Sequence, residues 1–178
     1  MTDSLGETLK AWHDFYMLIG GASATLVGLT FIAASIGAGQ IPRENEAGFR
    51  VFVTPTVVHF SAILIACLIV LAPFASVTAL GAVLLAEGAF GLAYCGWMWW
   101  RARKGGYAGR VDHIDRIWYA LAPVVGYAVV AGAAIAMVAG HGTSLGALAC
   151  GLGLLLIAAV RNAWDMTLWI MMRPRGET

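Results

Sequence analysis

Charged residues are scarce in this sequence. Asp, Glu, Lys and Arg make up 12% of its 178 residues, about half the share in a typical soluble domain. The 11 Lys and Arg nearly balance the 10 Asp and Glu, so charge indicates neither a nucleic acid nor an acidic partner. Hydrophobic residues reach 60%, which is the opposite of a disordered chain. The composition therefore excludes a disordered segment, a coiled coil and a basic nucleic-acid-binding module.

Cysteine and catalytic motifs are equally sparse. The three cysteines, Cys67, Cys95 and Cys150, lie in apolar stretches and form no C-x-x-C pair, so a disulfide-stapled secreted fold is excluded. We interpret them as small packing residues rather than ligands of a metal. The sequence also lacks a P-loop, G-x-G-x-x-G after a strand, H-E-x-x-H and G-x-S-x-G. We therefore expect no enzymatic activity, no cofactor and no metal site.

Long apolar runs dominate what is present. Five stretches reach the roughly 20 residues that an α-helix needs to cross a bilayer. They run over residues 15–37, 52–71, 77–100, 117–139 and 145–172. Pro73 and Ser76 separate the second from the third, and the turn at Gly140, His141 and Gly142 separates the fourth from the fifth. The sequence predicts one all-α domain over residues 1–178, a polytopic transmembrane bundle containing two antiparallel hairpins.

The basic residues are distributed unequally between the two sides of this bundle. One side has Lys10 alone, and the other has Arg43, Arg50, Arg101, Arg103, Lys104, Arg110, Arg116, Arg173 and Arg175. The positive-inside rule therefore predicts an outside N-terminus and a cytoplasmic C-terminus. The first span has an acidic flank and a long apolar core, unlike a cleaved signal peptide, so we expect it to stay as a helix.

Five polar residues inside the spans form a predicted buried polar cluster: His59, Glu87, Arg161, Asn162 and Asp165. Arg161 and Asp165 are one helical turn apart, and their depth matches that of His59, which predicts a His59–Asp165 contact. Glu87 lies farther from the basic side, either protonated, paired with Arg161 or carrying protons. The cluster is either a self-neutralised structural group or the charged lining of an ion path.

The second span contains Pro55, which cannot donate a backbone hydrogen bond and predicts a helix kink. His59, one turn away, is either a satisfied core histidine at this kink or a proton-relay or metal-binding imidazole. The first span has small residues at Gly20, Ala24 and Gly28, a spacing that lets two membrane helices approach closely. This ridge packs either inside the monomer or between subunits. The fourth span has no ionisable residue, and we expect it to be peripheral and lipid-facing.

Several segments are similar to a known group of proteins. Trp12–Tyr16 (WHDFY), Gly20–Leu29 (GGASATLVGL), Thr54–Phe60 (TPTVVHF) and Arg161–Asp165 (RNAWD) resemble a family of small bacterial polytopic inner-membrane proteins. Most of that family is uncharacterised, and some members are labelled modulators of a membrane-anchored AAA protease. The resemblance covers spans one, two and five, and it implies a multi-pass location in the bacterial inner membrane.

Three functions remain open from the sequence. The first is a non-catalytic accessory or regulatory protein that binds a membrane partner, as a homo-oligomer or part of a larger complex. The second is a small oligomeric protein that conducts ions or protons through the polar cluster. The third is a membrane enzyme or cofactor binder, for which a second histidine at the depth of His59 is missing. The short loops and the missing catalytic motifs favour the first.

Overall fold

The computed structural model describes residues 2–38, 46–104, 117–141 and 144–171. The helices in these ranges are α1 (Thr2–Ala38), α2 (Glu46–Leu71), α3 (Val77–Lys104), η3 (Ile117–Leu121), α5 (Ala122–Val138) and α6 (Leu145–Met171). Five helical segments, with η3 and α5 counted as one, are long and apolar enough to cross a membrane. The all-helical class and the five predicted spans are therefore confirmed.

Helix α1 begins well before the apolar stretch that predicts it. Its polar first turns extend the helix from residue 15 back to Thr2. Leu9 and Trp12 lie on this extension and pack against the core, and the Trp12 ring reaches Gly146 at the start of α6. Isolated polar turns are only marginally helical. The contact with α6 therefore explains why α1 extends beyond its apolar stretch.

Both predicted turns in the described residues have a clear local cause. Ser76 precedes α3, and its Oγ accepts a hydrogen bond from the backbone N–H of Ala79 at 3.1 Å, as an N-cap does. At the other turn Gly140 adopts a φ of 79°. The N–H of Gly140 donates to Met137 and that of His141 to Ala136, the pattern of a Schellman motif, which favours glycine at this position. Gly142 lies outside the described residues.

The fourth span also shows a local departure from regular helix. It begins with the π-helical turn η3, and Pro123 follows in the first turn of α5. Proline has no N–H to continue the regular ladder of hydrogen bonds toward the preceding turn, so the change of helix type falls where the sequence places the proline.

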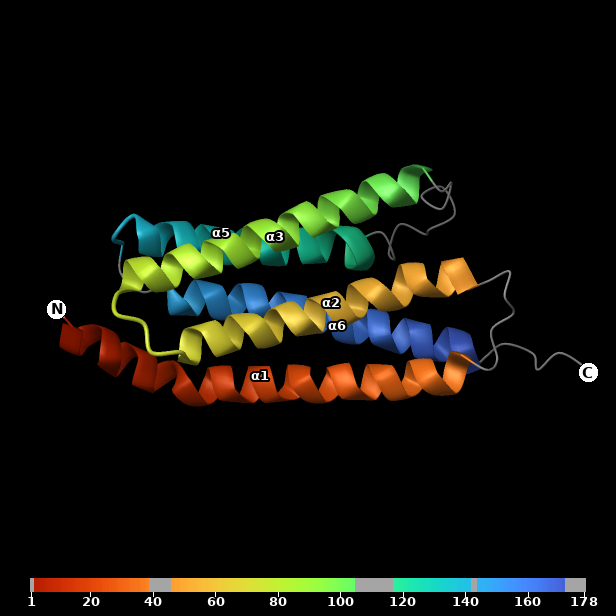
Figure 1. Ribbon diagram of the computed structural model, residues 1–178, viewed down its shortest axis with the longest axis horizontal. Helices are drawn as coiled ribbons and strands as arrows, with labels where there is room; N and C mark the ends of the chain where they lie inside the picture. The colour runs from red at the N-terminus through yellow and green to blue at the C-terminus, as the bar shows by residue number, and fades with distance from the viewer. Residues whose placement is uncertain (1, 39–45, 105–116, 142–143, 172–178) are drawn as a thin grey trace, which may run out of the picture.

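The helices pack as a bundle in which α6 lies between α2 and α5 (Figure 1). Helix α1 covers α2 on one side, and α3 covers α5 on the other. Helices α2 and α3 are joined by the Pro73 turn, yet each packs mainly against another helix. The start of α1 and the end of α6 lie at opposite ends of the bundle (Figure 1), as an odd number of spans requires.

The expected peripheral position of the fourth span is wrong. Half of the most apolar window of α5 is buried, against 22% for α1 and 28% for α3. Its small residues explain this position, because Gly126 and Ala131 allow close approach by α6 and α3 respectively. The fourth span is therefore half-buried against α3 and α6, and α1 is the least buried span.

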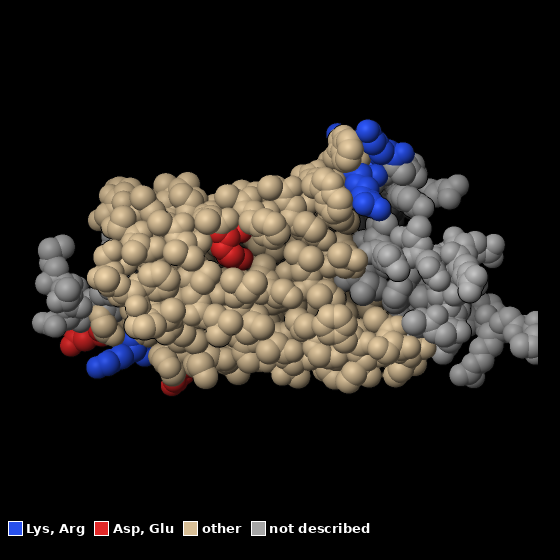
Figure 2. All heavy atoms as spheres, viewed as in Figure 1, with Lys and Arg blue, Asp and Glu red and all other residues tan. Residues whose placement is uncertain are grey.

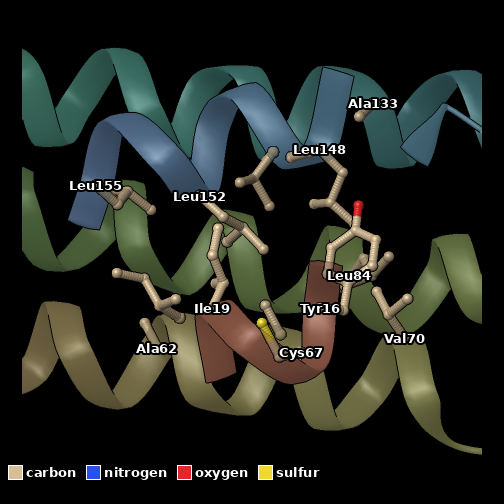
Figure 3. Close-up of a cluster of buried hydrophobic side chains, with 14 of the residues drawn as sticks. Tyr16, Ile19, Ala62, Cys67, Val70, Leu84, Ala133, Leu148, Leu152 and Leu155 are labelled. Atoms are coloured by element: carbon tan, nitrogen blue, oxygen red, sulfur yellow. The ribbon is translucent and has the colours of Figure 1, made fainter. Parts of the chain in front are cut away.

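A continuous apolar core fills the space between the helices. Tyr16, Leu84, Leu148 and Leu152 are fully enclosed and converge from α1, α3 and α6 (Figure 3). The Tyr16 hydroxyl donates a 2.7 Å hydrogen bond to the backbone carbonyl of Leu145, which is the first residue of α6. This bond aligns α1 with α6 at the end where the chain begins.

The charged side chains gather toward the ends of the bundle. Arg101, Arg103 and Lys104 mark one end of α3, called here the basic end, where each lies over a tryptophan ring of the same helix. Figure 2 shows these basic groups at one end and a nearly uncharged surface along the middle. Cation–π contacts with tryptophan suit side chains at a membrane–water interface.

Candidate functional site

A buried hydrogen bond between His59 and Tyr127 lies at the centre of the site. His59 on α2 is 2% exposed and Tyr127 on α5 is fully buried. The His59 Nδ1 and the Tyr127 hydroxyl are 3.0 Å apart. The ring of Tyr94, on α3, stands edge-on to the His59 ring with 6.2 Å between centroids. Three helices therefore contribute an imidazole and two phenols to one buried group, which we call the His–Tyr group (His59, Tyr94 and Tyr127).

Glycines on α3 determine how Tyr127 fits. The Tyr127 ring lies directly on Gly91, and the backbone of Ala131 lies on Gly88. A side chain at either glycine would occupy space that α5 already fills. The sequence places both glycines beside Glu87, and this spacing was the available signal that a neighbouring helix approaches α3 closely. It does not identify Tyr127, because no local pattern links residues of α3 to those of α5.

The predicted contact between His59 and Asp165 does not form. Gly126 contacts Gly151 and Leu155 of α6, so Tyr127 lies level with that part of the helix. Asp165 lies ten residues beyond Leu155, which is about 15 Å at the helical rise. Tyr127 is the hydrogen-bond partner of His59 instead. The sequence interpretation expected this partner to come from α6, but it comes from α5, which packs into the interior.

Arg161 and Asp165 form a separate pair near the basic end. Arg161 Nε and Asp165 Oδ2 are 3.7 Å apart, and the two side chains are 38% and 32% exposed. The Arg161 guanidinium also lies 5.4 Å from the ring centroid of Trp118 in η3. The charges of Arg161 and Asp165 therefore neutralise each other, and the Trp118 ring lies against the Arg161 guanidinium. The predicted i, i+4 pairing is present, but Arg161 does not meet Glu87.

Glu87 has a different environment from the other predicted residues. Both of its carboxyl oxygens are buried, and neither has a hydrogen-bond partner in the part of the chain that the structure describes. It precedes Gly88, which packs on Ala131. Ala131 is thirteen residues along the chain from Trp118, roughly 20 Å at the helical rise. Arg161 next to Trp118 is therefore too distant to neutralise Glu87.

Asn162 and Pro55 are both buried in the interior. Asn162 is 1% exposed, and neither its oxygen nor its nitrogen has a partner among the described residues. Pro55 lies inside α2, which stays helical from Glu46 to Leu71, and the kink at this proline stays a prediction. A buried amide without hydrogen-bond partners costs free energy, and Asn162 shares this lack of partners with the Glu87 carboxyl group.

The predicted small-residue ridge on α1 is divided between two faces. Gly20 is buried against Cys67, where an added Cβ would lie 3.0 Å from the Cys67 Cβ. Ala24 and Gly28 are exposed, and no atom lies within 4 Å of where a Cβ would stand at Gly28. Packing inside the monomer therefore uses Gly20 alone.

The described residues contain no group of three His, Cys, Asp or Glu side chains placed to hold a metal ion. His13 lies 3.1 Å from Asp14 on the exposed start of the first span. The three cysteines are unpaired, with Cys67 buried, Cys95 half-buried and Cys150 exposed. The imidazole and the two hydroxyls of the His–Tyr group can form hydrogen bonds and exchange protons.

The partial exposure of the Arg161–Asp165 pair changes what its removal should cost. A fully buried charged pair loses about 3–5 kcal/mol when one partner is removed, which is the value that the sequence interpretation implies for full burial. At this exposure we expect Asp165→Asn to lower the free energy of unfolding by about 1 kcal/mol or less. Reversible unfolding in mixed micelles measures it, with Arg161→Leu/Asp165→Leu as the control that removes both charges. A loss of several kcal/mol for Asp165→Asn would contradict this assignment.

Comparison with known proteins finds no family that matches this chain, no similar curated protein and no solved structure of similar fold.

Proposed function

We propose that this chain is a non-catalytic, multi-pass membrane protein that works by binding another membrane-embedded subunit through α1. The observation that carries the proposal is the outward face of α1, where Gly21, Ala24, Thr25 and Gly28 are all exposed. Small side chains at this spacing let two helix backbones approach closely in lipid. The low burial of α1 leaves that face free of the other four spans.

The arrangement of the first span supports this role in a second way. Its buried side, with Tyr16 and Gly20, packs against α6 and α2. The opposite side is thus available without disturbing the bundle. A second copy of this chain is the simplest partner to test, and a larger membrane complex is the alternative. The predicted bacterial inner membrane, with the N-terminus outside and the basic end in the cytoplasm, belongs to this proposal.

The test is the oligomeric state of the Gly28→Leu variant in mild detergent and in lipid nanodiscs. Leucine meets no atom of the monomer at this position, so we expect normal folding together with loss of the associated species. Native mass spectrometry measures the change, and thermal unfolding of the monomer checks that the fold is intact.

Gly96→Leu is the matched control, because Gly96 on α3 is exposed and likewise has no atom within 4 Å of an added Cβ. It should leave association unchanged. A wild-type protein that is monomeric under all these conditions would exclude a second copy as the partner. In that case, cysteine cross-linking at position 28 in native membranes, with position 96 as the control, tests for another subunit. Equal cross-linking at both positions would contradict the proposal.

A further inference from the structure

Glu87 lies near the middle of the apolar span Val77–Arg101. The oxygens of its carboxyl group are enclosed, with no hydrogen-bond partner among the described residues. The residue as a whole is half-buried. An ionisable residue at such a depth is costly and marks a functional site by default.

The helices around Glu87 bring it to the His–Tyr group. Glu87, Gly91 and Tyr94 are spaced four and three residues apart and share one face of α3. The Tyr127 ring lies against Gly91 on this face, and the ring of Tyr94 lies beside His59. Glu87 is therefore one helical turn along α3 from the glycine on which the Tyr127 ring lies, and the hydroxyl of that ring is hydrogen-bonded to an imidazole.

No positive charge compensates Glu87 in the described residues. The titratable groups that interact with it are Cys67 from α2 and Tyr127 from α5, and the remaining groups of the site, His59, Tyr94 and Cys95, lie around Tyr127. None of them is a permanent cation, and an unpaired carboxylate in an apolar interior is strongly unfavourable. The neutral acid, with its proton bound, is the form that these surroundings favour.

We propose that Glu87 is a proton-binding site within the membrane, and that it exchanges its proton toward the basic end through the Tyr127 hydroxyl and the His59 imidazole. This inference goes beyond the proposed function and does not depend on it. The site is proposed to take a proton rather than a metal ion, because the described residues contain no group of three His, Cys, Asp or Glu side chains placed to hold a cation such as Mg²⁺ or Zn²⁺.

The transfer is balanced at each group. Glu87 gives its carboxyl proton to the Tyr127 oxygen, directly or through one bridging water. Tyr127 passes its own hydroxyl proton along the existing 3.0 Å hydrogen bond to His59 Nδ1. Glu87 becomes a carboxylate, His59 becomes an imidazolium, and Tyr127 is unchanged. No electron is transferred and no co-reactant is needed.

The experiment is infrared spectroscopy of the full-length protein in lipid nanodiscs during transfer from H₂O into D₂O. We expect the carbonyl band of a protonated carboxylic acid in the wild type, its shift as deuterium replaces the proton, and its absence in Glu87→Gln. Tyr127→Phe keeps the ring on Gly91 and removes only the hydroxyl. It should slow the shift of the band at least about tenfold, as loss of a positioned proton-transfer group does.

Tyr16→Phe is the matched control, because the Tyr16 hydroxyl is also buried but donates to the Leu145 carbonyl, outside the His–Tyr group. It should leave the exchange rate unchanged. If Glu87→Gln fails to fold, modification of the wild type by a lipophilic carbodiimide, located by mass spectrometry, reports a protonated carboxyl group at the same position. An acid band that persists in a folded Glu87→Gln variant, or no carbodiimide adduct at Glu87, would overturn the proton site. A Tyr127→Phe variant that exchanges as fast as wild type would overturn the path.

Discussion

Replacing Gly91 by alanine should destabilise the bundle more than any other single methyl group added to α3. The new Cβ would lie 2.6 Å from Cγ of Tyr127 and closer still to two other ring atoms. Tyr127 is fully buried, so its rigid ring has no free space to enter. Overpacking of a filled interior costs about 1–3 kcal/mol and sometimes more, and we expect a value near the upper end. Equilibrium unfolding in mixed micelles measures the loss.

Gly96→Ala provides the control on the same helix. No atom lies within 4 Å of a Cβ at Gly96, and alanine favours a helix over glycine by about 1 kcal/mol. This variant should be as stable as wild type or more stable. Adding Tyr127→Ala to Gly91→Ala should cost less than the sum of the two single changes, because residues in contact are not additive. Equal stability of the Gly91→Ala and Gly96→Ala variants would show that α3 and α5 are not packed as described.

Replacing Phe60 by alanine should produce the second large effect. Phe60 on α2 is fully enclosed in the core. In water-soluble proteins such a truncation costs roughly 3–5 kcal/mol, from lost transfer free energy together with the cavity left behind. Within a bilayer the transfer contribution is small because lipid tails are as apolar as the protein interior. The cavity remains, so we expect a loss of about 2–3 kcal/mol.

Phe90→Ala separates packing from simple loss of an aromatic ring. Phe90 lies on α3 and is 66% exposed, so its ring makes few contacts inside the bundle. The same truncation should there change the free energy of unfolding by less than about 0.5 kcal/mol. A comparable loss at both positions would indicate that Phe90 is covered by a partner or that Phe60 is less enclosed than the structure shows.

The Arg161–Asp165 pair and the polar residues around Glu87 indicate different roles. The Arg161–Asp165 pair is partly exposed and covered by Trp118, which suits anchoring of α6 near the basic end. Glu87 and the His–Tyr group lie deeper and leave buried polar atoms without partners. Arg161 and Asp165 neutralise each other's charge although Arg161 Nε and Asp165 Oδ2 make no hydrogen bond, whereas Glu87 has no cation beside it among the described residues and needs a proton to remain uncharged. The site that merits functional experiments is therefore the one around Glu87.

Local features of the sequence determined the five apolar helices and the two turns between them, but not the start of α1. Span length and apolar composition predicted five crossings, because a membrane-spanning helix must satisfy all its backbone hydrogen bonds within itself. The positions of Pro73, Ser76 and Gly140 predicted the two turns, and the structure explains them by a cap at Ser76 and a positive φ at Gly140, which both depend on a few adjacent residues. The i, i+4 pairing of Arg161 with Asp165 followed from helix geometry for the same reason.

Only the tertiary structure decided which helices meet and which polar groups become partners. The composition of α5 suggested a lipid-facing span, because an apolar helix looks the same whether lipid or protein covers it. The structure buries this helix between α3 and α6, divides Gly20 from Gly28 on α1, and gives His59 the hydroxyl of Tyr127 instead of Asp165. Hydropathy reports the depth of a residue along the membrane normal. The choice of neighbour at that depth depends on close packing of side chains from distant segments, such as Tyr127 on Gly91.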